Sequence, residues 1–197
     1  MKRPRVGILG GTFDPLHVGH LIVAQDVLQA LDLERILFLP AAQPPHKEGR
    51  AVTPARIREE MVRAGVANDP RFEMSDLEIR RGGRSYTVQS LRRLSSFHAQ
   101  TRFHLIMGVD QFAEFSTWRD PQEVAVLARL VVMTRAGEDP SQVDPGVEVD
   151  YEAVPVTRVD VSSTRIRARV REGRPVRYLV PEPVRRIIER EGLYKNG

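Results

Sequence analysis

Two histidines near the start of the chain have a spacing that suits chemistry. His17 and His20 end the segment Gly10-Gly11-Thr12-Phe13-Asp14-Pro15-Leu16-His17-Val18-Gly19-His20. On the first turn of a helix, residues three apart share one face, so both imidazoles can point at one ligand. A plainer interpretation stays open for such a pair: a helix cap beside a core histidine. A zinc site needs a third ligand, and metal binding by these histidines is not expected.

The glycines of the same segment can bind an anion. Gly10 and Gly11 follow a predicted strand, and backbone without side chains lets N–H groups approach a phosphate closely. The start of the next helix adds a partial positive charge. With Thr12 and Phe13, the glycines form a candidate phosphate cradle. The segment matches neither G-x-G-x-x-G nor the Walker A motif, which disfavours ordinary dinucleotide binding and P-loop hydrolysis.

The loop after the second predicted strand offers two side chains for a polyphosphate. Its sequence is Leu39-Pro40-Ala41-Ala42-Gln43-Pro44-Pro45-His46-Lys47. The prolines stiffen a loop that ends in an imidazole and an ammonium group. A proline-rich surface loop with a solvated lysine is an equal alternative on spacing alone.

A third phosphate site is predicted near the C-terminus. Ser163, Thr164 and Arg167 lie in Val161-Ser162-Ser163-Thr164-Arg165-Ile166-Arg167, which puts hydroxyls and a guanidinium at a predicted helix start. Helix amides, hydroxyls and arginine together bind phosphate well. The alternative is an ordinary helix cap before a solvated basic helix.

Tyr86, Thr87 and Trp118 are candidates for binding a different group. Tyr86 and Thr87 lie at the start of a predicted helix over 87–97, so their amides are free to receive a carboxylate. Trp118 is the only tryptophan and can stack on an aromatic ring. A cap, a core tyrosine and a packed tryptophan are the plainer alternatives.

Short apolar runs at Val6–Leu9, Ile36–Leu39, Phe103–Met107 and Leu130–Met133 predict buried strands, with a further strand near Tyr151–Val156. Helices are predicted from about 21 to 31, 53 to 67, 87 to 97, 162 to 171 and 183 to 191. Thr53 is expected to cap the second of them. The alternation predicts an α/β fold, a Rossmann-like doubly wound parallel sheet with helices on both faces and ligands at the strands' carboxyl ends.

The composition limits the class of protein. The 197 residues fit one domain over 1–197, with a helical C-terminal part from about 162. Charges of 30 Lys plus Arg against 26 Asp plus Glu give only +4, which is compatible with nucleic acid, phosphorylated small molecules or acidic surfaces but is weak evidence for any of them. No nucleic acid partner is expected. The chain has no cysteine, which excludes disulfides and thiol nucleophiles. No signal peptide or membrane span is expected, and the interpretation is a cytoplasmic protein in which oligomer formation stays open.

The segment from Gly10 to His20 resembles the signature of the nucleotidyltransferase superfamily, which contains adenylyl- and cytidylyltransferases. The 161–167 segment resembles the partner motif ISSTxIR, with Val161 a departure at its first position. The resemblance implies that His17 and His20 contact a nucleoside triphosphate and stabilise charge at the reacting phosphorus. It also implies that Ser163, Thr164 and Arg167 hold the β- and γ-phosphates.

Matches spread from Gly10 to Arg167 resemble the bacterial nicotinate-nucleotide adenylyltransferase family. The resemblance implies that Tyr86, Thr87 and Trp118 bind nicotinate mononucleotide, and we place His46 with them and Lys47 with the ATP phosphates. Residues expected near the ribose and base of ATP are Gly108, Asp110 and Arg135. The departures are Ala136 where the family often has Pro and Ser90 where Thr is usual.

The resemblance implies adenylyl transfer from ATP to nicotinate mononucleotide, with Mg²⁺ carried by the ATP phosphates and no metal held by the protein. One alternative is a transferase of the same fold that accepts phosphopantetheine or nicotinamide mononucleotide. Another is an RNA- or nucleotide-binding module without catalysis, suggested by six arginines between Arg165 and Arg177.

Overall fold

Short aliphatic runs form the strands of one parallel sheet, whose order is β3-β2-β1-β4-β5-β6. The computed structural model describes residues 3–44, 52–135 and 137–195. The strands are β1 (Arg5–Gly11), β2 (Arg35–Pro40), β3 (Phe72–Met74), β4 (Arg102–Gly108), β5 (Arg129–Thr134) and β6 (Tyr151–Pro155). Strand order reverses between β1 and β4, the point at which sheets of this kind bind ligands. The expected Rossmann-like, doubly wound fold is confirmed.

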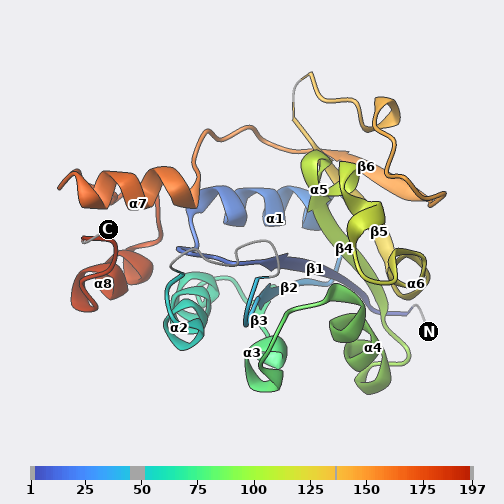
Figure 1. Cartoon of the computed structure of the whole chain (residues 1–197), viewed down its shortest axis with the longest axis horizontal. Coiled ribbons are helices and arrows are strands. Elements are labelled where there is room, and N and C mark those ends of the chain that lie inside the picture. The colour runs from blue at the N-terminus through green and yellow to red at the C-terminus, as the bar shows by residue number, and fades with distance from the viewer. Residues whose placement is uncertain (1–2, 45–51, 136, 196–197) are drawn as a thin grey trace.

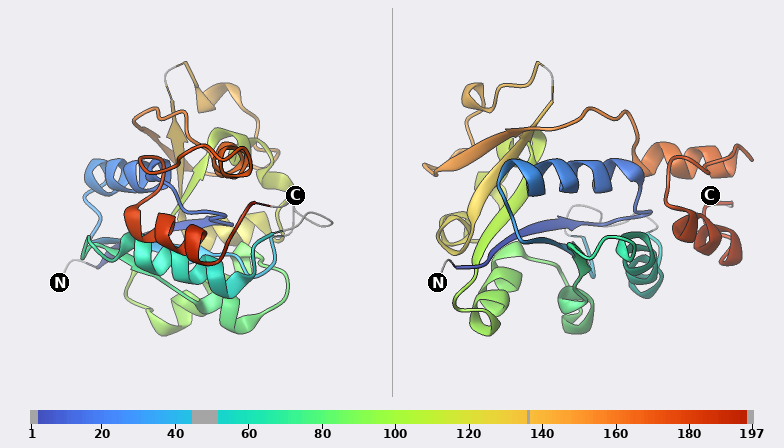
Figure 2. Two further views of the ribbon diagram at one scale, coloured as in Figure 1. Left: turned by 90° about the vertical axis from the view of Figure 1, so that its left-hand side faces the viewer. Right: turned by 180° about the vertical axis from the view of Figure 1, so that it is seen from behind.

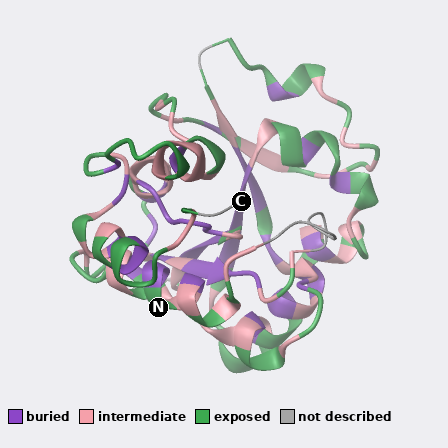
Figure 3. Cartoon of the chain, turned by 60° about the vertical axis from the view of Figure 1, so that its left-hand side comes forward, coloured by how far each residue is buried: buried purple, intermediate pink, exposed green. Residues whose placement is uncertain are grey.

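Helices cover both faces of the sheet (Figure 1). They are α1 (Val18–Ala30), α2 (Ala55–Val66), α3 (Leu77–Arg81), α4 (Thr87–Phe97), α5 (Val109–Ala113), α6 (Pro121–Leu127), α7 (Ser163–Arg171) and α8 (Glu182–Arg190), with 3-10 turns η2 (Phe115–Thr117) and η3 (Pro140–Gln142). Buried residues of α1, α2, α7 and α8 share one apolar cluster, and those of α4, α5 and α6 share the other. The strands between the two clusters are the most buried part of the chain (Figure 3).

Several elements differ in detail from the sequence prediction. Helix α4 begins and ends as expected, but α2 begins at Ala55 with Pro54 at its cap position and no side-chain cap. Thr53 is therefore not the cap that was expected. Strand β3 and helix α3 were not predicted, because three and five residues are too short to show a period.

The last two helices return to the α1 and α2 side of the sheet (Figure 2). Helix α8 packs beside α2, and an ion pair of 2.8 Å joins Arg190 to Glu60. Ile166 of α7 and Ile187 of α8 are buried in the same apolar cluster as α1. Within the described ranges, no helix has the length and apolar character that crossing a membrane requires.

Candidate active site

The loop between β1 and α1 folds over an aromatic ring. Phe13 has a positive φ of 49°, and its ring is 2% exposed. A Cβ on Gly11 would lie only 3.0 Å from that ring, so glycine allows the loop to close over it. The ring also meets His20 edge-on, with 5.0 Å between centroids. The glycine segment and the second histidine are thus parts of one packed unit.

The two histidines lie against each other at the start of α1. Their rings stack with 3.7 Å between centroids and 25° between planes. His17 is the cap residue of α1, and its backbone N–H donates to Nδ1 of His20 over 3.2 Å. Because Nδ1 of His20 accepts this bond, the proton of the neutral ring is on Nε2. A Cβ on Gly19 would come within 3.1 Å of His17 Nδ1, which explains the glycine between them.

Burial keeps both imidazoles neutral at neutral pH in the free protein. It lowers the pKa of His17 from 6.5 to about 4. Burial also lowers the pKa of His20 well below its ordinary value, and the neighbouring His17 lowers it further. The pair therefore offers neutral N–H donors rather than permanent positive charges until an anion arrives.

Helix α7 meets the first loop through side chains that sequence analysis singled out. Ser163 Oγ donates to the carbonyl of Pro15, 148 positions away in sequence, over 2.9 Å. Arg167 Nη1 donates to the carbonyl of Asp14 over 2.8 Å, and its Nη2 lies 3.3 Å from the hydroxyl of Thr164. Residues from opposite ends of the chain are therefore brought to one place, as the two resembling motifs require.

A cavity of ≈ 230 Å³ opens beside the glycine segment. Its lining includes Gly10, Gly11 and Thr12 from the first loop, Tyr86 and Thr87 at the start of α4, and Trp118 after η2. The first amides of α4 have no acceptor within the helix. The structure thus brings together the predicted phosphate cradle and the three residues predicted to bind the second substrate.

The wall of this cavity is held by contacts between two loops. The hydroxyl of Ser85 accepts a hydrogen bond from the backbone N–H of Ala42 over 2.9 Å. Gln43 and Arg84 form a single parallel bridge beside it. Arg119 also lines the cavity, and its guanidinium carbon lies 5.0 Å from the centroid of the Tyr86 ring.

A second, smaller cavity lies at the carboxyl ends of β4 and β5. It holds ≈ 50 Å³, and its lining includes Gly108, Asp110 and Arg135 together with Val23 of α1. The backbone N–H of Arg135 donates to Glu138 over 2.8 Å. These three predicted nucleotide-binding residues therefore share one site. His46 and Lys47, the remaining predictions, lie outside the described residues.

Sequence analysis missed a buried polar group beneath the site. Arg58 of α2 is 1% exposed, and its guanidinium donates to carbonyls of Thr12, Ala41, Ala42 and Thr53 at 2.6–2.9 Å. Burial lowers the pKa of Arg58, which the nearby Asp14 partly offsets. In the sequence, the one signal for this role is an arginine on the predicted helix face that faces the core.

Glu78 is another missed residue. It is 5% exposed, lines the cavity of ≈ 230 Å³ and accepts a hydrogen bond of 2.5 Å from Ser90. Ser90, one of the departures from the family pattern, is the donor of this bond. No group of three or more metal-ligating side chains occurs in the part of the chain that the structure describes.

The sheet order and the loops that meet above its reversal point define a nucleotidyltransferase, and the cytidylyltransferase-like family model matches residues 8–169. A Desulfitobacterium hafniense (strain Y51) protein named "Probable nicotinate-nucleotide adenylyltransferase" is 46% identical over 97% of this chain and 96% of its own. One of the same name from Thermus thermophilus is 43% identical over 97% and 100%. The chain belongs to the nicotinate-nucleotide adenylyltransferase family.

The fold is shared with more distant proteins. Plasmodium falciparum nicotinic acid mononucleotide adenylyltransferase, solved in complex with NaAD, superposes with a TM-score of 0.80 at 16% identity and 98% coverage of both chains. A sheet and helices of this arrangement are therefore kept at very low sequence identity.

Proposed function

We propose that this protein transfers the adenylyl group of ATP to nicotinate mononucleotide, giving nicotinate adenine dinucleotide and pyrophosphate, a step of NAD biosynthesis. An oxygen of the mononucleotide phosphate forms a bond to the α-phosphorus while the bond from that phosphorus to the bridging β-phosphate oxygen breaks. The observation that carries the proposal is the cavity shared by Gly10, Gly11, Tyr86, Thr87 and Trp118. An acceptor bound in this cavity would lie directly beside the predicted phosphate cradle.

The reaction needs charge stabilisation more than acid–base chemistry. The attacking phosphate is already mostly ionised at neutral pH, because its second pKa is about 6. No general base is required, and the protein's role is to hold two polyanions in line. We assign His20 Nε2–H as a donor to the triphosphate, since its Nδ1 already accepts from His17.

A bound triphosphate changes the charge state of the histidine pair. Negative oxygens beside the rings favour the imidazolium form and raise the pKa of the nearer histidine. The stacked partner at 3.7 Å resists a second proton because like charges would then be in contact. We therefore expect the pair to take up one proton at most on binding ATP.

Further donors to the triphosphate are proposed around this pair. We assign Ser163, Thr164 and Arg167 to the β- and γ-phosphates, Lys47 to the same region and His46 to the mononucleotide. Asp110, Gly108 and Arg135 are assigned to the ribose and base, because they line one cavity next to α1.

Mg²⁺ fits this site as a partner of the substrate. The described residues offer no cluster of metal ligands, and Mg²⁺ commonly keeps several waters and binds through substrate phosphates. When bound there, it neutralises developing charge on the phosphate oxygens. The protein's own contribution is then the imidazoles, hydroxyls and guanidinium that surround the phosphates.

The acid form of the pyridine should be favoured over the amide. Free amides at the start of α4 and its dipole stabilise a carboxylate, whereas an amide group brings its own NH₂ donor against them. Trp118 packs on Phe115 with 5.5 Å between ring centroids, which fixes a face for the pyridine ring.

We also propose that the chain works as one unit over 1–197 and acts in the cytoplasm.

The experiment is a pyrophosphate-release assay with pure protein, ATP, Mg²⁺ and one acceptor at a time. We expect release with nicotinate mononucleotide, weaker release with nicotinamide mononucleotide and none with phosphopantetheine. Turnover with phosphopantetheine alone would overturn the substrate assignment. Absence of release with every acceptor, together with tight and salt-sensitive binding of RNA, would instead favour the non-catalytic alternative.

A further inference from the structure

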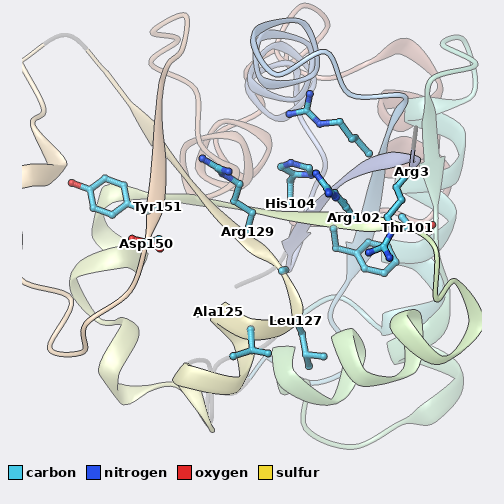
Figure 4. A pocket seen from close by; sticks show the side chains of 13 residues that line it. Arg3, Thr101, Arg102, His104, Ala125, Leu127, Arg129, Asp150 and Tyr151 are labelled. Atoms are coloured by element: carbon cyan, nitrogen blue, oxygen red, sulfur yellow. The ribbon is translucent and has the colours of Figure 1, made fainter. Parts of the chain in front are cut away.

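Another cavity lies away from the site above, at the amino ends of the strands (Figure 4). It holds ≈ 990 Å³, within the range that accommodates small-molecule ligands. Strand β1 has seven residues, so Arg5 at this end lies about 20 Å from Gly11 at the other. The cavity is therefore separate from the proposed active site.

Arginines gather on one face of the sheet at this cavity. Arg5 pairs directly with Arg102 across β1 and β4, and His104 pairs with Arg129 across β4 and β5. Residues two apart on a strand point to the same face, so these four side chains all lie on one side. Figure 4 shows His104 with Arg102 and Arg129 on either side of it.

The positive charge of this cluster is only partly balanced. Arg129 forms an ion pair of 2.9 Å with Glu152 of β6. Among the residues that the structure describes, the guanidinium groups of Arg5 and Arg102 have no carboxylate partner. Arg3 and the exposed Asp150 complete the charged lining. Two guanidinium forks are thus available, and their planar geometry matches phosphate oxygens.

A buried polar atom supplies a second, independent observation. His104 is 3% exposed and lines the cavity, and its Nδ1 has no hydrogen-bond partner in the described structure. Unpaired polar atoms of this kind are costly and call for a ligand or water. Burial first, then Arg5 and Arg129, lower the pKa of His104, while a hydrogen bond of the ring to the Arg102 backbone and the charge of Glu152 raise it. The imidazole ring therefore lies in a positive electrostatic potential, which a bound anion would reduce.

We propose that this cavity is a second binding site that takes a phosphate-bearing small molecule, with Arg5 and Arg102 gripping the phosphate beside His104. The lining also includes apolar residues of α6 and of the segment that follows it, from Ala125 to Ala128. The site is independent of adenylyl transfer, since its residues lie at the opposite ends of the strands.

Calorimetric titration with inorganic phosphate and, separately, with ADP tests the proposal. We expect ADP to occupy two sites on the wild type and one on Arg5→Gln/Arg102→Gln, with phosphate affinity at least tenfold lower in that variant. Its adenylyl transfer should be unchanged, which also reports that it folds. Arg93→Gln, an exposed arginine of α4, is the matched control and should bind as the wild type does.

A spectroscopic readout places the ligand. In NMR titrations, the pKa of His104 should rise when phosphate is added to the wild type and stay unchanged in the double variant. ADP at least tenfold tighter than phosphate identifies a nucleotide as the ligand, and equal affinities identify free phosphate. Equal binding by the wild type and the double variant would overturn the proposal, as would an equal loss in Arg93→Gln, because the binding would then be unspecific.

Discussion

The hydroxyl of Tyr194 donates a hydrogen bond of 2.6 Å to Oδ1 of Asp14, joining the C-terminal end of the described chain to the first loop. Asp14 is 3% exposed, and its other oxygen accepts from the backbone N–H of Thr53 over 3.2 Å. A buried carboxylate needs such donors. The loop that carries the histidines is therefore held from two distant parts of the chain.

We expect Tyr194→Phe to lower the free energy of unfolding by about 1–3 kcal/mol, because it leaves a buried carboxylate oxygen without its donor. Urea titration followed by circular dichroism measures this. Tyr178→Phe is the matched control, since Tyr178 is 85% exposed. Equal stability of the two variants would show that the Tyr194 hydroxyl does not hold the loop.

Arg58→Lys should be destabilising by about 3 kcal/mol or more, although the charge is kept. A lysine ammonium cannot reach the four carbonyls that the guanidinium fork joins, so the first and second loops lose their common support. Turnover should fall with it, because displaced loops misplace the phosphates. Arg63→Lys on the same helix is the control, as its side chain is 61% exposed. A variant as stable and active as this control would contradict the role.

The sequence predicts the scaffold well and the supports of the site poorly. Buried strands and α4 show clear periodicity, and the loops after them follow from the rule that ligands bind at the strands' carboxyl ends. Arg58 and Tyr194 act through contacts with residues far away in sequence, and local patterns carry no such information. The low pKa of His17 is likewise a result of burial, which spacing alone does not reveal.

The face of α1 illustrates the same limit. The helix period in the sequence runs through Leu21, Ile22, Gln25, Leu28 and Leu31, whereas the buried residues of the helix are Ala24, Val27 and Leu28, so only Leu28 belongs to both sets. Apolar residues lie on most sides of this helix, and buried residues of α7 and α8 share its cluster, so the period alone does not select the face. The contacts of α1 are with β1, β2 and β6, so packing on the sheet makes that selection.

His20→Ala should lower kcat by about a hundredfold or more while the fold is kept, because it removes a donor to the triphosphate. His20→Asn separates two roles of the ring. Asparagine keeps an acceptor near Nδ1 for the His17 N–H, but it has no group at Nε2, so we expect it to be as inactive as alanine. His98→Ala, an exposed histidine, is the control. Near-normal kcat in a folded His20 variant would remove this residue from catalysis.

Acidification should destabilise the free protein through the buried histidines. The pKa of His17 is about 4 in the folded state against an ordinary 6.5, so its neutral form is favoured by folding. That stability is present above pH 6.5 and is lost as the pH falls toward 4. Between pH 7 and pH 5 the loss from this one group is about 2 kcal/mol.

The measurement compares the free energy of unfolding of wild type and His17→Ala at pH 7 and pH 5. We expect the variant to lose less stability over this interval. If both proteins lose the same amount, His17 is not buried as a neutral ring. Addition of ATP should reduce the wild-type loss, since bound phosphates raise the pKa of the nearer imidazole.

The pocket proposed for nicotinate mononucleotide gives the last two predictions. Trp118→Ala should raise KM for nicotinate mononucleotide by about tenfold with little change in KM for ATP, because the variant loses a stacking face worth about 0.5–1.5 kcal/mol and the packing around it. Trp118→Phe keeps an aromatic face and should recover most of the affinity. Steady-state kinetics with each substrate varied in turn distinguishes these outcomes. An equal rise of KM for ATP in Trp118→Ala would place the tryptophan elsewhere in the reaction.

In the wild type, kcat/KM should be higher for nicotinate mononucleotide than for nicotinamide mononucleotide, because the α4 amides favour a carboxylate. Equal kcat/KM for the two mononucleotides would show that Tyr86 and Thr87 do not select the acceptor.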